Sequence, residues 1–93
     1  MRGVIMIRDK AIIIFNNVKL NTAVDIEIPL NITANELIVG LNVAYNLGID
    51  MSDIKNCYLK AENPIALLRG NKTLAQFGIH NGSIINYNEL SES

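Results

Sequence analysis

Residues 69–87 read RGNKTLAQFGIHNGSIINY, and this stretch decides the fold. Residues 73–77 predict a short helical turn between two loop segments. Asn81 and Gly82 form a pair that is typical of tight turns, because both residue types tolerate a positive φ angle. The run IINY at Ile84–Tyr87 favours a final β-strand. The chain is therefore expected to end in a strand that follows a tight turn.

Two strands are predicted earlier in the chain. Residues 11–15, AIIIF, form an apolar run rich in β-branched side chains, which suits a buried strand. Residues 23–29 alternate between apolar and charged positions, as a strand with one covered face does. The apolar side chains on its one face are Val24, Ile26 and Ile28. We expect Pro29 to end this strand or to lie at a sheet edge, because proline cannot donate to a neighbouring strand.

The main helix is predicted to begin at a capping box. Thr33 and Glu36 have the required spacing, with each side chain binding a backbone N–H at the helix start. Gly48 is placed to end the helix in a left-handed conformation. Gly40 lowers helix stability by about 1 kcal/mol relative to alanine, and we expect its missing side chain to let the helix lie close to the sheet. The apolar residues expected on the buried side are Leu37, Ile38, Leu41, Ala44, Tyr45 and Leu47.

Two more strands are predicted in the second half. Residues 57–62 alternate, which places Cys57 and Leu59 on the face opposite Lys60. Residues 65–68 return as a short strand after an Asn-Pro turn. With the last strand the order is ββαβββ, so the helix must cover one face of a mixed sheet. The expected class is α+β, with four to five strands packed on one main helix.

This order is that of the β-grasp fold, and the closing stretch resembles the second half of ubiquitin-like domains. The residues that carry the resemblance are Gly70, Thr73, Leu74, Gly78, Ile79, Gly82 and Ile85. In that family the final strand runs through the middle of the sheet. The resemblance covers residues 10–90, which we interpret as one ubiquitin-like domain between an N-terminal extension, residues 1–9, and a C-terminal tail, residues 91–93.

Within this superfamily the chain resembles the small bacterial proteins of the YukD and EsaB type, accessory components of the type VII (WXG100) secretion system. The similarity rests on length, on the motif VDIEIP at residues 24–29 and on the turn GIHNG at residues 78–82. It implies a cytoplasmic, non-enzymatic interaction module that assists or regulates export. The implied partners are secretion-machinery components, either membrane proteins or an FtsK/SpoIIIE-type ATPase.

Other functions remain open. A sulfur carrier or ubiquitin-like modifier needs a flexible Gly-Gly end for activation by an E1-like enzyme. The sequence ends NELSES at residues 88–93 and contains no Gly-Gly, so we expect neither conjugation nor sulfur transfer. A regulatory binding domain unrelated to secretion is the remaining alternative. A small enzyme is disfavoured, because one His and one Cys give little material for a catalytic site.

The amino-acid composition argues against several classes of protein. With 93 residues the chain has room for one core, and 49% hydrophobic against 18% charged residues favours a folded domain. The net charge of -1, with scattered basic residues, lacks the basic surface that nucleic acid binding needs. The apolar run at residues 3–7 is too short to span a bilayer, so we expect no direct membrane insertion.

Single residues indicate no catalytic, cofactor or metal site. Cys57 is the only cysteine, which precludes an intramolecular disulfide and fits a reducing cytoplasm. Its place in an alternating segment favours a buried apolar role. His80 is expected to be a turn residue. Asp50 and Asp53 lack the spacing of a calcium loop, and we expect them to be solvated or to cap a helix.

The polar outer face of the sheet is the predicted protein-binding surface. Asn86 and Asn88 are expected to point outward where ubiquitin presents part of its apolar patch, so this surface should be more polar than ubiquitin's. Lys60 and Arg69 are expected to lie outward on neighbouring strands. The candidate contact residues are therefore Lys60, Arg69, Asn86 and Asn88.

Residues 1–9, MRGVIMIRD, allow several interpretations. One interpretation is that they have no fixed structure, or that the true start of the protein is Met6. Another is that they extend the first strand. Alternatively, they or an edge strand pair with an exposed sheet edge of a second copy to form a homodimer.

Overall fold

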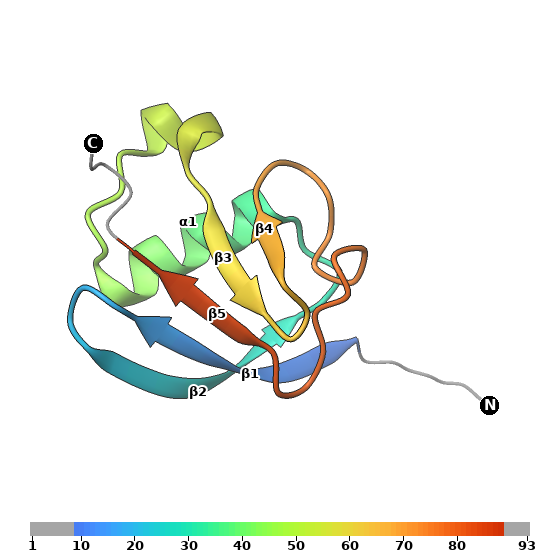
Figure 1. Ribbon diagram of the computed structural model, residues 1–93. Coiled ribbons are helices and arrows are strands. Elements are labelled where there is room, and N and C mark those ends of the chain that lie inside the picture. Colours follow the sequence, from blue (N-terminus) through green and yellow to red (C-terminus); the bar gives the residue numbers. More distant parts are fainter. Residues whose placement is uncertain (1–8, 89–93) are drawn as a thin grey trace.

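The computed structural model describes residues 9–88 as a five-stranded mixed sheet with one main helix across one face (Figure 1). The strands are β1 (Lys10–Asn17), β2 (Thr22–Pro29), β3 (Leu59–Glu62), β4 (Ala66–Leu68) and β5 (Ile84–Tyr87). The helices are α1 (Ala34–Tyr45) and the short 3-10 helix η1 (Met51–Asn56). The sheet order is β2-β1-β5-β3-β4, which confirms the predicted α+β class with the order ββαβββ.

The first and last strands form the centre of the sheet. Ile14 of β1 pairs with Ile84 of β5, and this is a parallel pairing, whereas all other neighbouring strands are antiparallel. The preceding turn holds β5 in place: the Gly82 N–H donates to the Ile12 carbonyl, and the Ile14 N–H donates to the Ser83 carbonyl, each at 3.0 Å. Gly82 has a φ of 90°, so the predicted turn glycine is confirmed.

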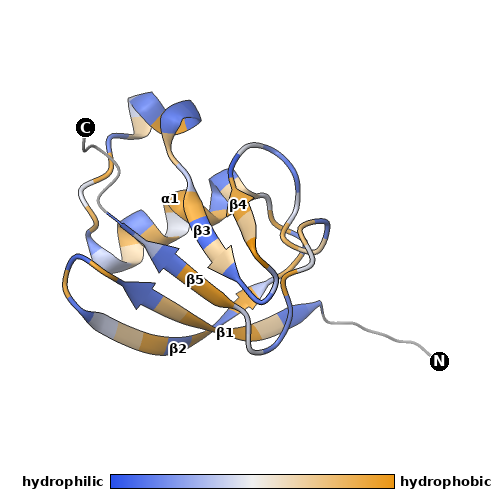
Figure 2. Ribbon diagram, in the orientation of Figure 1, coloured by the Kyte–Doolittle hydropathy of each residue, from blue (hydrophilic) through white to orange (hydrophobic). Residues whose placement is uncertain are grey.

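The core lies between α1 and one face of the sheet. Ile13, Phe15 and Ile85, from the two central strands, are almost completely buried. Side chains that alternate with them point to the other face, as the pleat of a strand requires. Figure 2 shows hydrophobic and hydrophilic residues alternating along the strands, and hydrophilic residues in η1. The helix residues in the core are Ala34, Leu37, Ile38 and Leu41.

The start of α1 matches the prediction, but its end does not. The Thr33 hydroxyl accepts from the Glu36 N–H at 3.1 Å, and the Glu36 carboxylate accepts from the Thr33 N–H at 2.9 Å. The helix ends at Asn46, which has a φ of 53°, and the predicted end at Gly48 is wrong. Asparagine, like glycine, adopts the left-handed conformation at helix ends, and Asn46 precedes Gly48 in the chain.

Three expectations about the buried side of α1 are wrong as well. Tyr45, at the end of the helix, is 39% exposed, although its ring centroid lies 5.1 Å from that of Phe15. Ala44 is exposed, because the buried stripe begins at Ala34 and a period of 3.6 residues leaves Ala44 on its flank. Gly40 is exposed, and a methyl group added there would meet no atom within 4 Å. The glycine is therefore not a point of close approach between helix and sheet.

The strands also differ from prediction in detail. β3 begins at Leu59, because Cys57 still belongs to the end of η1, where its N–H donates to the Ile54 carbonyl at 2.9 Å. Asp50 caps η1, because its carboxylate accepts a hydrogen bond from the Ser52 N–H. Capping a helix is one of the two roles that were expected for this residue. Pro29 ends β2, as predicted, and β2 lies at a sheet edge.

Along β2 the predicted apolar face is only partly covered. Val24, Ile26 and Ile28 pair with residues of β1 that face the core, so the three share one face. Only Ile28 is buried, and Val24 is 41% exposed. The edge strand therefore carries unburied apolar surface on its helix side.

The structure does not test the predicted N-terminal extension or the predicted C-terminal tail. Apart from Asp9, the extension at residues 1–9 lies outside the described residues, as does the tail at residues 91–93. Across residues 9–88, no helix has the length and the apolar character that a membrane crossing requires.

Two glycine substitutions should have opposite effects. Gly40→Ala should raise the free energy of unfolding by about 1 kcal/mol, because alanine favours the helix and the added methyl group meets open space. Gly82→Ala should lower it by about 1 kcal/mol or more, because its backbone conformation strains an L-residue. Urea denaturation measures both. A destabilised Gly40→Ala variant would contradict the exposed position of this glycine.

Candidate functional site

The face of the sheet opposite α1 is open, and its side chains follow from strand alternation. On β3, Leu59 and Ala61 are buried, so Lys60 and Glu62 point outward. On β5, Asn86 lies between two buried neighbours and also points outward. Polar side chains from two adjacent strands therefore meet on this face.

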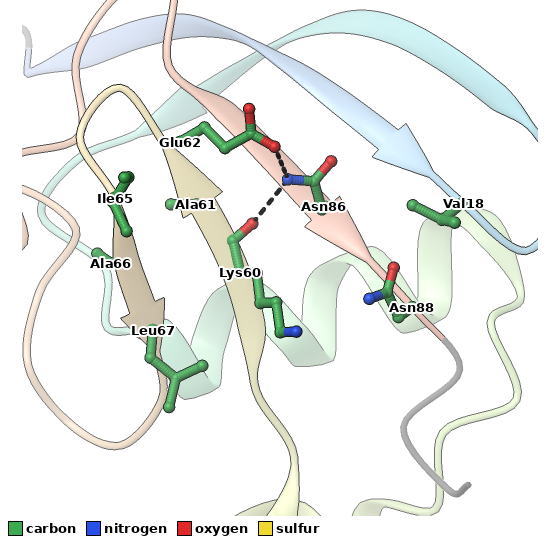
Figure 3. Close-up of a pocket in the computed structure, with 9 residues that line it drawn as sticks. All are labelled: Val18, Lys60, Ala61, Glu62, Ile65, Ala66, Leu67, Asn86 and Asn88. Atoms are coloured by element: carbon green, nitrogen blue, oxygen red, sulfur yellow. Dashed lines mark hydrogen bonds between the residues drawn. The ribbon is translucent and has the colours of Figure 1, made fainter.

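A groove of ≈ 600 Å³ lies on this face, bounded by the β3–β4 hairpin, β5 and the turn after β1 (Figure 3). Ile65 at the hairpin is 91% exposed, and Leu67 on β4 is 43% exposed. Val18, at the other side of the groove, is also exposed. Apolar side chains grouped in a groove with polar neighbours are typical of protein contact sites. The lining residues are Val18, Lys60, Ala61, Glu62, Ile65, Ala66, Leu67, Asn86 and Asn88.

Asn86 joins the three central strands on this face. Its amide nitrogen donates to the Glu62 carboxylate at 2.9 Å and to the Lys60 carbonyl at 3.3 Å (Figure 3). Its amide oxygen accepts from the Asn16 side chain at 2.8 Å. The side chain at the floor of the groove is thus held in one orientation.

Three of the four predicted contact residues line this groove. Lys60, Asn86 and Asn88 lie together there. Arg69 does not line it, because β4 ends at Leu68 and the Arg69 guanidinium donates to the Lys55 carbonyl at 3.4 Å, on the side of η1. A role in binding stays a prediction for all four residues.

The apolar part of the groove was not predicted. Ile65 and Leu67 share one face of the hairpin, because they are two residues apart and Leu68 faces the core. The sequence IALL at residues 65–68 could have indicated this apolar surface. If Leu68 faces the core, its neighbour Leu67 must point outward. The candidate surface is therefore mixed, whereas the expectation was a polar one.

The residues that were considered for chemistry do not line the groove. Cys57 is a free, buried thiol, 6% exposed, and burial raises its pKa, with smaller contributions from the charges of Asp53 and Asp50. Hydrogen bonds from Ser52 lower the pKa of Asp50. His80 lies in a turn, where its Nδ1 is 2.9 Å from the Gly78 carbonyl. In the part of the chain that the structure describes, no three His, Cys, Asp or Glu residues form a group that could hold a metal ion.

Comparison with known proteins gives one family match. A family model described as "WXG100 protein secretion system (Wss), protein YukD" matches residues 15–86. No curated protein matches the chain. The matched range begins within β1 and ends within β5, so it spans the whole sheet.

Solved structures agree on the fold. Tubulin-binding cofactor B of Trypanosoma brucei has a TM-score of 0.67 at 10% identity, over 90% of this chain and 99% of that one. The C-terminal ubiquitin-like domain of mouse tubulin-specific chaperone e has a TM-score of 0.66 at 13% identity, over 91% and 93%. The ubiquitin-like domain of yeast Ddi1 has a TM-score of 0.58 at 15% identity, over 95% and 99%. The predicted ubiquitin-like fold is confirmed.

The thiol of Cys57 should react slowly in the native protein. Because the thiolate is the reactive form, a raised pKa leaves less thiolate at a given pH than an ordinary cysteine has. The rate of alkylation by iodoacetamide should therefore reach its midpoint at a higher pH than in the same protein unfolded in urea. Asp53→Asn should move the midpoint part of the way back, since burial remains. A native midpoint at or below the unfolded one would contradict this environment.

Proposed function

The chain belongs to the YukD family of the WXG100 protein secretion system, and on this premise we propose that it serves that system as a non-enzymatic binding domain. It contacts secretion-machinery components, either membrane proteins or an FtsK/SpoIIIE-type ATPase. It acts in the cytoplasm, and the free thiol of Cys57 supports this, because cysteines stay reduced there. Family membership favours this function over a regulatory domain unrelated to secretion.

The groove on the open face of the sheet is the observation that carries the proposal. Ile65, Leu67 and Val18 expose apolar surface that a partner can cover, and each Å² of apolar surface removed from water contributes roughly 25 cal/mol. The side chain of Asn86 is already fixed by its hydrogen bonds. Binding then costs little ordering of the groove floor.

The chemistry of the groove indicates what its partner presents. An apolar side chain fits between the β3–β4 hairpin and Val18, and the exposed ammonium group of Lys60 favours a carboxylate beside it. The carboxylate of Glu62 is engaged by Asn86. The partner segment is therefore apolar with an adjacent acidic residue.

The positions of the reactive groups support the proposal that the domain is not an enzyme. Cys57 is buried with a raised pKa, which disfavours a nucleophile. His80 is engaged with its own turn, at the Gly78 carbonyl. Neither side chain lines the groove. These positions favour binding over catalysis as the role of this surface.

Substitutions in the groove should weaken partner binding without unfolding the domain. Ile65→Ser and Leu67→Ser remove the exposed apolar surface and should each weaken binding to the purified secretion component by about tenfold, roughly 1.4 kcal/mol. Stability should change by less than about 0.5 kcal/mol, because both side chains are exposed. Biolayer interferometry measures affinity, and thermal denaturation measures stability.

The chain offers a matched control for this experiment. Val43→Ser removes an apolar side chain that is 77% exposed on α1, on the other side of the sheet, and should leave affinity unchanged. Arg69→Ala should also leave it unchanged, because Arg69 lies outside the groove. Unchanged affinity of the Ile65 and Leu67 variants would refute the groove. Failure of the intact protein to bind any secretion component would refute the function itself.

A further inference from the structure

The free edge of β2 is a second surface, and the proposed function does not use it. On β1, the Ile12 carbonyl and the Ile14 N–H bind the segment that leads into β5. Because peptide groups of successive residues point to opposite sides of a strand, the odd-numbered residues of β1 bind β2, at its even-numbered residues. The N–H and carbonyl groups that face away from the sheet are therefore those of Ala23, Asp25 and Glu27, and we call this row of groups the β2 edge.

The β2 edge lacks the features that commonly prevent a sheet edge from pairing. Such features are a very short strand, a bulge, lysine side chains or a proline within the strand. β2 spans eight residues, pairs with β1 without a bulge and contains no lysine, and its one proline, Pro29, ends it. Within the described residues β2 is the last strand on its side, whereas the opposite edge strand, β4, has only three residues. The β2 edge is therefore the one that is long enough to pair with another strand.

The helix side of this edge is apolar. Val24 is exposed there, and Ile26 is only partly buried. Tyr45 lies on the same side, because its ring stacks at an angle on Phe15, the residue of β1 that pairs with Val24. The tyrosine ring is itself partly exposed. A strand added at the β2 edge can cover this surface with apolar side chains of its own.

The outer side of the same edge is acidic. Asp25 and Glu27 are exposed and lie two residues apart, so both carboxylates point to the outer side. Opposite charges directly across a strand pair stabilise it. A strand that fits the β2 edge therefore has basic residues at two alternate positions and apolar residues between and beside them.

A second copy of β2 does not meet this requirement. In an antiparallel pair of two β2 edges, Asp25 and Glu27 of one copy would lie opposite the same carboxylates of the other. Like charges directly opposite each other destabilise a strand pair. The edge thus disfavours pairing with itself and favours a strand with basic residues.

We infer that the β2 edge binds an extended segment of a partner protein in which basic and apolar residues alternate, and that this segment joins the sheet as an antiparallel strand. Antiparallel pairs are slightly more stable per residue than parallel ones. Two basic residues of the segment lie opposite Asp25 and Glu27 and exchange backbone hydrogen bonds with them. The apolar residues cover Val24 and Ile26 on the helix side. The backbone bonds supply affinity, and the alternating side chains supply specificity.

The segment bound at β2 differs in charge from the partner of the groove. Beside the groove, the ammonium group of Lys60 favours an acidic residue, whereas Asp25 and Glu27 favour basic ones. The two sites are therefore tested with different ligands, and loss of binding at one does not imply loss at the other.

A synthetic peptide of alternating sequence tests this inference with the full chain. The probe is Thr-Val-Lys-Ile-Lys-Val-Thr with both ends blocked. In an NMR titration of isotope-labelled protein it should bind with a Kd below about 1 mM. The largest shifts should occur at the amides of Ala23, Asp25 and Glu27. The same peptide with glutamate in place of both lysines should bind about tenfold more weakly or worse, and so should Thr-Lys-Lys-Ile-Val-Val-Thr, which keeps the composition without the alternation.

Charge substitutions in β2 test the side-chain recognition. Asp25→Asn/Glu27→Gln should weaken binding of the probe about tenfold, and Asp25→Lys/Glu27→Lys should reverse the preference in favour of the glutamate peptide. The matched control Glu36→Gln/Asp53→Asn makes the same change in net charge on α1 and η1 and should leave affinity unchanged. Glutamine at position 36 can still complete the capping box.

Methylation of the peptide backbone tests strand addition separately from charge. In the antiparallel pair the N–H groups of both lysines face β2, whereas that of the central isoleucine faces solvent. N-methylation of the second lysine should therefore weaken binding about tenfold or more, and N-methylation of the isoleucine should change it little. Equal effects of the two methyl groups would overturn the inference. So would equal affinity for the lysine and glutamate peptides, no binding of the probe at about 1 mM, or self-association of the protein through the amides of the β2 edge.

Discussion

The parallel pairing of β1 with β5 is the constraint on which the rest of the structure depends. β2 is held only by β1, and β3 and β4 join the sheet only through β5. The buried Ser83 secures the entry to β5: its hydroxyl donates to the Asn63 carbonyl at 2.6 Å and accepts from the His80 N–H at 3.0 Å. One side chain therefore ties the closing turn to the β3–β4 hairpin, and burial makes the loss of either bond costly.

A sheet with a single covering helix leaves one face and two edges open, and the two surfaces described above are of these two kinds. The groove lies on the open face, where Asn86 fixes the floor and the hairpin supplies apolar walls. The other surface is the edge formed by β2, where Val24 leaves apolar surface uncovered and Asp25 and Glu27 are exposed. The groove and the β2 edge lie at different strands of the sheet.

The sequence predicted most of the fold because its local signals agree with one another. Alternation defined the strands, and the pair Thr33 and Glu36 located the start of α1. The end of α1 was missed, because Asn46 and Gly48 both adopt a positive φ and local sequence does not rank them. In the groove, three predicted residues came together, but the exposure of Ile65 and the position of Arg69 depend on where β4 begins and ends. Strand boundaries are set by tertiary pairing, which alternation alone does not determine.

The central position of β5 also determines when this protein can fold during its synthesis. Ile84 is made long after Ile14, its partner in the sheet, so the nascent chain contains β1 and β2 with nothing on the other side of β1. Contacts so distant in sequence require a large loop to close first, which slows folding compared with a helical bundle. The domain therefore completes its core only after the last strand has left the ribosome. Until then β1 itself is an unprotected edge, and chaperones that shield nascent chains have a defined segment to cover.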